Sequence, residues 1–200
     1  AMTTGADTTL YEYDRNNRLT KESRGNSRTD YRYDANGNLT TRAKGVLSGG
    51  AGAEELTLGE TDGESLSLAG AELTVYSYDT RDRLTGVQSD NGMIASYSYG
   101  ADNMRRSKTV NGETTRQIWD NGRIAGERNA SGEITAKYYY GNAILASDAG
   151  EGVGYYQSDS HGDITGYAGR TYAYDAFGNR ETAGAEDTNP FGYCGEYYDR

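Results

Sequence analysis

A ten-residue word built on tyrosine and aspartate recurs along this chain of 200 residues. "YRYDANGNLT" begins at Tyr31, and similar words begin at Tyr11, Tyr76 and Tyr172. Most leading positions are about 20 residues apart, and the longer step from Tyr31 to Tyr76 predicts a unit that has lost its tyrosines. A unit of about 20 residues cannot bury enough apolar surface to fold alone. The chain is therefore predicted to be a repeat protein whose units fold only when they are stacked.

Each unit predicts two strands joined by a tight turn. Tyr31 and Tyr33 are two residues apart, so an extended chain directs both rings to one face. Asp34 to Gly37 fits a type I turn, in which the Asp carboxylate accepts hydrogen bonds from backbone amides two residues on. Leu39 then begins the return strand. The positions assigned to this structural motif are Tyr11, Tyr13, Asp14, Tyr31, Tyr33, Asp34, Gly37, Leu39, Tyr76, Tyr78, Asp79, Leu84, Tyr97, Tyr99, Trp119, Tyr172, Tyr174, Asp175, Gly178 and Tyr193.

Further turn signals close the other ends of the strands. Asn91-Gly92, Asn111-Gly112 and Ser131-Gly132 are residue pairs expected of two-residue hairpin loops. Between Tyr97 and Ala146, short strand words and turn words alternate with hardly a spare residue, and helix signals are nearly absent. The predicted fold class is all-β: a continuous antiparallel meander of about fifteen strands, two per repeat, that forms a curved or spiral sheet.

The composition fits a fold built on tyrosine. A formal net charge of −10 and few aliphatic residues are typical of disordered chains, but 19 tyrosines supply rings that can be buried while each hydroxyl keeps a polar partner. There is no basic stripe to neutralise phosphates and no apolar run long enough to span a membrane, which argues against nucleic-acid binding and a membrane span. Six of the excess acids fall in residues 45–74, which contain no Lys or Arg.

The domain organisation follows from these features. Residues 1–9 are expected to be a leader, with an Ala-Met opening typical of a cloning scar, and no signal peptide is present. Residues 10–200 are expected to form one β domain. Within it, residues 45–74 are predicted to be either an acidic, Gly-rich hairpin insertion or a degenerate repeat.

Candidate chemistry is weak in this sequence. The aspartates Asp14, Asp34, Asp79 and Asp175 invite comparison with the paired carboxylates of glycosidases, but each occupies the same turn-starting position, so they are not expected to converge. His161 is interpreted as a turn residue and Cys194 as a free thiol on a turn. A single cysteine argues against an internal disulfide and a cysteine-based metal site. No catalytic residue, metal or cofactor is predicted, and the chain is not expected to be an enzyme.

The repeated "YxYDxxGNLT" words resemble the YD repeat of the RHS proteins over nearly all of residues 10–200. "NPFGYCGEYYD", which begins at Asn189, is similar to the opening of the RHS core segment, so residues 189–200 are expected to begin that core. The units near Ile118 and Tyr155 depart from the strict word. The resemblance implies large secreted or cell-surface proteins, including bacterial polymorphic toxins, insecticidal toxin complexes and teneurins. Their repeats form a hollow β shell that, in the bacterial toxins, encloses a C-terminal toxin domain.

Two functions are carried forward from this resemblance. The first is a structural segment of the shell wall, whose partners are the remainder of the shell and an enclosed toxin domain that residues 1–200 lack. The alternative is a carbohydrate-binding or adhesion module that uses the tyrosine-rich β surface and has glycans as partners. Exposure of the tyrosine rings discriminates between the two. Open sheet edges are a further route to self-association.

Overall fold

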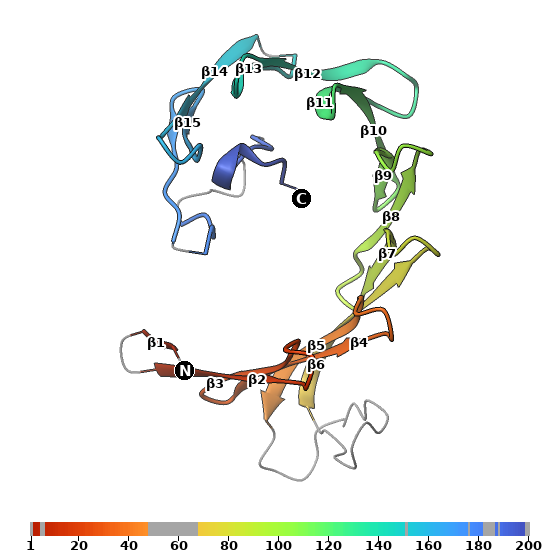
Figure 1. Ribbon diagram of the computed structural model, residues 1–200, viewed down its shortest axis with the longest axis vertical. Helices are drawn as coiled ribbons and strands as arrows, with labels where there is room; N and C mark the ends of the chain where they lie inside the picture. The colour runs from red at the N-terminus through yellow and green to blue at the C-terminus, as the bar shows by residue number, and fades with distance from the viewer. Residues whose placement is uncertain are drawn as a thin grey trace. The chain divides into compact units, whose positions relative to one another are not determined.

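The computed structural model describes residues 2–4, 7–47, 68–150, 152–175, 177–181, 187 and 189–198. The all-β expectation is confirmed: these residues form sixteen strands and one short 3₁₀ helix, with no α-helix among them. Successive strands pair in antiparallel fashion wherever a register is defined, which is the predicted meander (Figure 1). No helix within the described ranges is long and apolar enough to cross a bilayer.

The chain divides into two units, Ala1–Ser98 with Lys108–Gly112, and Tyr99–Ser107 with Glu113–Arg200. The strands of the first unit are β1 (Met2–Thr4), β2 (Asp7–Tyr13), β3 (Leu19–Arg24), β4 (Ser27–Tyr33), β5 (Leu39–Leu47), β6 (Leu68–Tyr78), β7 (Leu84–Ser89) and most of β8 (Ile94–Tyr99). Residues of β9 (Arg105–Val110) belong to both units.

The second unit continues the same pattern. Its elements are β10 (Glu113–Asp120), β11 (Arg123–Arg128), β12 (Ile134–Tyr140), β13 (Ile144–Asp148), β14 (Val153–Ser158), β15 (Ile164–Tyr167), β16 (Arg170–Thr171) and the 3₁₀ helix η1 (Tyr193–Gly195). Tyr193, one of the predicted motif positions, lies in η1 and not in a strand. After β16 the described chain makes isolated bridges, such as the one between Tyr174 and Arg180, in place of a regular hairpin.

Two kinds of turn alternate with the strands. Asn111-Gly112 is the predicted two-residue loop, and both residues have positive φ, 50° and 88°. The prediction of two-residue loops at Asn91-Gly92 and Ser131-Gly132 was wrong, because both pairs lie in three-residue loops. In the second of these turns the N–H of Asn129 donates to the carbonyl of Glu133, so three residues lie between the closing pair. The Asn129 carboxamide oxygen also accepts from the Glu133 N–H at 3.0 Å, a bond that holds the longer loop closed.

A register shift follows each tyrosine turn of the first unit. Tyr33 pairs with Leu39, and the preceding pair joins Arg32 to Thr41, so Thr40 is an extra residue on the return strand. Thr20 and Thr85 occupy the same position in their own hairpins. The Thr40 hydroxyl donates to the Arg32 carbonyl at 3.2 Å, which gives the extra residue a polar partner on the facing strand. Such a bulge bends and twists the hairpin at a fixed place in each repeat.

The strands on either side of the acidic segment pair with each other directly. The register of β5 and β6 joins Leu47 to Leu68 and Val46 to Ala69. The hairpin or degenerate-repeat prediction was made for residues 45–74. Residues 45–47 and 68–74 of this range lie in β5 and β6, and residues 48–67 lie outside the described part of the chain. Tyr31 lies in β4 and Tyr76 in β6, with β5 as the described strand between them. Tyr11 lies in β2 and Tyr31 in β4, with β3 between them, so both intervals contain three described strands.

An aromatic core lies in the second unit. It is built from Ile, Ala and Tyr side chains of β11, β12, β13 and β15 together with Tyr172 and Phe191. The Phe191 ring makes edge-to-face contacts with Tyr138 and Tyr156, with centroids 5.1 and 5.6 Å apart. Asn189 is 1% exposed and its side chain hydrogen bonds both the N–H and the carbonyl of Phe191. The "NPF" segment therefore folds back into the core of its own unit, as the blue C-terminal ribbon of Figure 1 does.

Candidate functional site

The motif aspartates are used by their own turns. In the turn after β6, one oxygen of Asp79 accepts the N–H groups of Arg81 at 2.9 Å and Arg83 at 3.1 Å. The other oxygen accepts Nε of Arg83 at 2.8 Å. The same three bonds recur in the turns that begin at Asp14, Asp34 and Asp175, with Arg18, Asn38 and Asn179 as the side-chain donors.

This bonding fixes the charge state of the carboxylates. The Arg83 side-chain bond, with help from the two backbone amides, lowers the pKa of Asp79 to about 2. The Asn38 side chain lowers the pKa of Asp34, and the Asn179 side chain lowers that of Asp175. A glycosidase needs one carboxyl whose pKa is raised, so that it can donate a proton. These aspartates are ionised, and each is bonded within its own turn.

The second aromatic residue of a unit reaches back to the unit before it. The Tyr33 hydroxyl donates to the main-chain carbonyl of Leu19 at 2.8 Å, and Tyr78 donates to Leu39 at 3.0 Å. Three further bonds of this kind lie in the second unit, from Tyr140 to Ile124, from Tyr174 to Ile164 and from Trp119 to Arg105. In each bond between tyrosine and carbonyl, the acceptor lies at the start of a strand: Leu19, Leu39 and Ile164 are the first residues of β3, β5 and β15, and Ile124 is the second residue of β11. We call this contact the repeat joint.

Neighbouring turns reinforce the joint. The guanidinium of Arg18 lies 5.0 Å from the centroid of the Tyr33 ring and also donates to the Asp34 carbonyl at 3.2 Å. A cation over an aromatic face is attracted by the ring quadrupole. Further along, the side-chain amides of Asn36 and Asn38 both donate to Asp82, at 2.9 and 2.8 Å. The polar turn residues therefore connect one repeat to the next.

The exposure of the motif tyrosines varies along the chain. Tyr31, Tyr33, Tyr76 and Tyr78 are half-buried, and Tyr172 is buried. Tyr13, in the first tyrosine word, is 56% exposed. The half-buried rings thus contribute to packing and keep some exposed area, while the joint occupies the hydroxyl where it forms.

Two components of this site were not predicted from the sequence. One is the threonine that follows the leucine, which fills the bulge, and the other is the residue four positions after the aspartate, which bonds its second oxygen. The signal for both was present, because "LT" recurs after the turn and the fifth turn position is Arg or Asn in the strict words.

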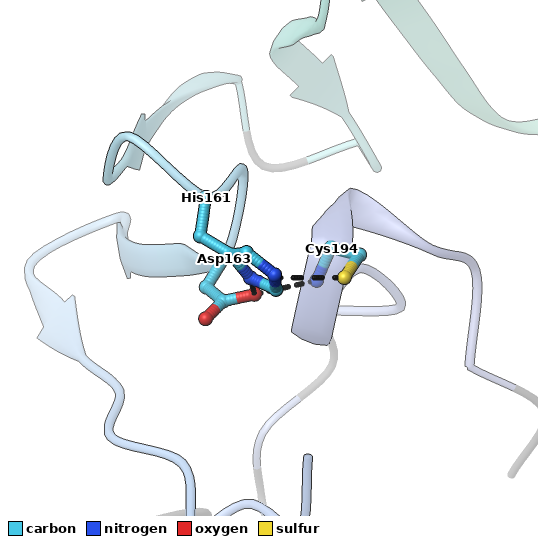
Figure 2. Close-up of side chains that lie close together, drawn as sticks. All are labelled: His161, Asp163 and Cys194. Carbon is cyan, nitrogen blue, oxygen red and sulfur yellow. Dashed lines mark hydrogen bonds and ion pairs between the residues drawn. The ribbon is translucent and has the colours of Figure 1, made fainter. Parts of the chain in front are cut away.

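A second cluster lies where a turn of the second unit meets η1 (Figure 2). His161 is in the three-residue turn that begins at Asp159, as expected of a turn residue, and Cys194 is an exposed free thiol. Nδ1 of His161 lies 3.0 Å from an Asp163 oxygen and 3.8 Å from the sulfur of Cys194. The Cys194 N–H donates to the same Asp163 oxygen at 2.7 Å.

This cluster does not have the geometry of a nucleophilic cysteine site. In such a site the aspartate holds the ring nitrogen opposite the one that faces the nucleophile. Here Asp163 and Cys194 approach the same nitrogen, Nδ1 of His161. Burial, aided by nearby carboxylates, raises the pKa of the Cys194 thiol, whereas a reactive cysteine needs a lowered one. The three donor atoms do lie within 4.8 Å of one another, a proximity that counting cysteines could not reveal.

An antiparallel meander whose short units are joined by tyrosine hydroxyls defines a β-repeat protein. Residues 13–46 match the RHS Repeat family. The tRNA3(Ser)-specific nuclease WapA of Bacillus spizizenii is 34% identical over 139 residues, or 62% of this chain. The tRNA nuclease WapA of Bacillus subtilis is 31% identical over 145 residues, again 62% of this chain. These matches support an RHS/YD-repeat protein.

The chain spans only 6% of the length of these two relatives. The solved structure of TcdB2-TccC3 matches with a TM-score of 0.43 and 16% identity, covering 87% of this chain and 9% of that one.

Proposed function

We propose that the chain is a non-enzymatic segment of a longer, secreted or cell-surface RHS protein, in which it builds part of the wall of a β shell. The shell encloses a C-terminal toxin domain that lies outside residues 1–200. The supporting observation is the repeat joint, because it commits the tyrosine hydroxyls to the carbonyls of the preceding unit. Side chains used to hold neighbouring repeats together support a wall better than a reactive site.

The nuclease activity named for the WapA relatives is not assigned to this segment. The shared part is a small fraction of those proteins, and the strict turns of this chain use their aspartates for backbone bonding. We assign to the chain the role that such bonding supports, which is to hold a repeat in register.

Protease protection tests the wall function in the longer polypeptide that carries these repeats. The expected result is a C-terminal domain that resists an added protease while the repeats are intact. Replacing both Tyr33 and Tyr78 by Ala removes two joints and is expected to expose that domain to cleavage. Tyr155→Ala is the matched control, because the Tyr155 ring is 72% exposed. A C-terminal domain that is cleaved equally fast with the native repeats would contradict the proposal.

Carbohydrate binding is the second candidate, and one cavity favours it. A cavity of about 360 Å³ in the second unit is lined by Trp119, Arg123, Tyr140, Asn142 and Glu196, among others. Aromatic faces beside a few polar groups are typical of small-molecule sites. A glycan array probed with the 200-residue chain tests this candidate. A signal that is lost in Asn142→Ala supports it, and the absence of any signal removes it.

A further inference from the structure

We propose that His161, Asp163 and Cys194 bind a zinc ion, which ties the turn before β15 to η1. This site is independent of the wall function. It is carried by three different side chains from two segments, one imidazole nitrogen, one carboxylate oxygen and one sulfur, which converge at the surface (Figure 2). This donor set suits zinc, because thiolate and imidazole are its usual ligands and carboxylate is its common third partner.

The spacing of the donor atoms fits a single ion. Tetrahedral zinc holds sulfur at about 2.3 Å and nitrogen or oxygen at about 2.0–2.2 Å, so its ligand atoms lie about 3.3–3.6 Å from one another. Nδ1 of His161 is 3.0 Å from the Asp163 oxygen and 3.8 Å from the Cys194 sulfur. All three donor atoms lie within 4.8 Å of one another, so side-chain movements of about an ångström bring them to bonding distance. The fourth position is left to water.

The turns that begin at Asp34 and Asp175 provide an internal comparison for the turn that begins at Asp159. The turn at 159–163 has the same main-chain bonds as those at 34–38 and 175–179, with an N–H from the first residue to the fifth carbonyl. The fifth residue of those two turns is Asn38 or Asn179, which bonds the turn aspartate. In the 159–163 turn it is Asp163, whose Oδ1 instead faces His161 and the Cys194 N–H. The ligand residues are therefore not needed to make the turn.

The surroundings favour a cation and leave it a path from solvent. His161 and Cys194 are exposed, so an ion can enter without opening the core. Cys194 also adopts a left-handed backbone conformation, with φ of 52°, which is uncommon for a residue with a side chain. On binding, the thiol loses its proton to solvent, and the thiolate and the Asp163 carboxylate together balance the two positive charges of zinc.

Cobalt titration tests the site in the untagged, reduced 200-residue chain, since a histidine tag would bind the metal itself. Co²⁺ in a tetrahedral site with a thiolate ligand gives a near-ultraviolet sulfur-to-metal band and visible ligand-field bands. We expect saturation at one Co²⁺ per chain, displacement of Co²⁺ by Zn²⁺, and loss of the sulfur band in Cys194→Ser. A native chain with no such band at saturating Co²⁺ would overturn the proposal.

The paired substitution His161→Asn and Asp163→Asn is the matched variant. It gives the turn the Asn residues that the 34–38 turn carries at the same positions, so the metal-free variant is expected to unfold at the native temperature. Its Zn²⁺ affinity is expected to fall at least about tenfold. Added Zn²⁺ is expected to raise the unfolding temperature of the native chain and not that of the variant. Equal Zn²⁺ affinity in the two chains refutes the site, and Cys194→Ser supplies the same comparison if the paired variant is less stable.

Discussion

The hydroxyl of Tyr33 donates a hydrogen bond of 2.8 Å to the main-chain carbonyl of Leu19, fourteen residues earlier and in the preceding repeat. The bond links the end of one outgoing strand to the start of an earlier return strand. Tyr78 makes the equivalent bond to Leu39 across a separation of 39 residues. The joint therefore has the same geometry whether or not extra residues lie between the two repeats.

Removing a single hydroxyl measures the strength of this joint. Tyr33→Phe keeps the ring but leaves the Leu19 carbonyl without its donor, so we expect a loss of about 1 kcal/mol in the free energy of unfolding. Tyr33→Ala also removes a half-buried ring and is expected to cost about 2–3 kcal/mol, below the range for fully buried aromatic residues. Urea unfolding measures both, with Tyr155→Phe as the exposed control. Equal stability of the native chain and Tyr33→Phe would show that the joint contributes nothing.

The acid stability of the chain is expected to depend on the turn aspartates. The folded-state pKa of Asp79 is about 2, below its ordinary value of 3.8. Its contribution to stability is therefore present above about pH 4 and is lost as the pH falls through about 2. Asp79→Asn removes that part of the pH dependence, so urea midpoints measured between about pH 6 and pH 2 should fall less steeply in the variant. Parallel curves for the two chains would contradict this assignment.

Alkaline pH is expected to act through the aromatic core of the second unit. Burial raises the pKa of Tyr140 from 10.0 to about 12 and also raises the pKa values of Tyr138 and Tyr156. Because these folded-state values exceed the unfolded one, the stabilisation is complete below about pH 10 and is lost as the pH rises through about 12. Tyrosinate absorbance and near-ultraviolet circular dichroism should change together in this window. Tyrosines that all ionise near pH 10 with no loss of fold would refute the prediction.

The parts of the fold that were predictable depend on contacts close in sequence. Asp34 bonds the amides of residues two and four positions on, so the turn is determined by five consecutive residues. The alternation of Tyr31 and Tyr33 likewise follows from strand geometry alone. The partner of the Tyr33 hydroxyl was not predictable, because Leu19 meets it only after the strands have paired.

The length of a turn could not be predicted from its central residue pair alone. The pairs Asn111-Gly112 and Ser131-Gly132 both carry a turn signal, yet the first makes a two-residue loop and the second lies in a longer one. The difference comes from Asn129, whose side chain closes the longer turn from outside the pair. The cluster around Cys194 is harder still, since the cysteine lies 33 residues from His161 and reaches it only through the return of the C-terminal segment.

Two equivalent glycines allow a matched test of strand packing. Gly86 lies two residues after Leu84, which pairs with Tyr78, and Gly126 lies two residues after Ile124, which pairs with Trp119. A Cβ on Gly126 would lie 2.7 Å from the Ala136 carbonyl oxygen on the facing strand, whereas one on Gly86 would be no closer than 3.7 Å to any atom. Gly126→Ala is expected to destabilise the chain by about 1–3 kcal/mol, and Gly86→Ala by less than about 0.5 kcal/mol. Thermal and urea unfolding measure both, and equal effects would contradict the close approach.

The direct pairing of β5 with β6 predicts that the intervening segment can be shortened. Leu47 at the end of β5 pairs with Leu68 at the start of β6. In the hairpin closed by the two-residue loop Asn111-Gly112, the corresponding strand ends are Val110 and Glu113. Replacing residues 48–67 by Asn-Gly is therefore expected to keep the register, and the shorter loop should add up to about 2 kcal/mol to stability. Urea unfolding measures the gain, and size-exclusion chromatography reports whether association rises once the segment is removed. A shortened chain that loses its cooperative unfolding would show that residues 48–67 supply part of the sheet, as a degenerate repeat would, and not an insertion between paired strands.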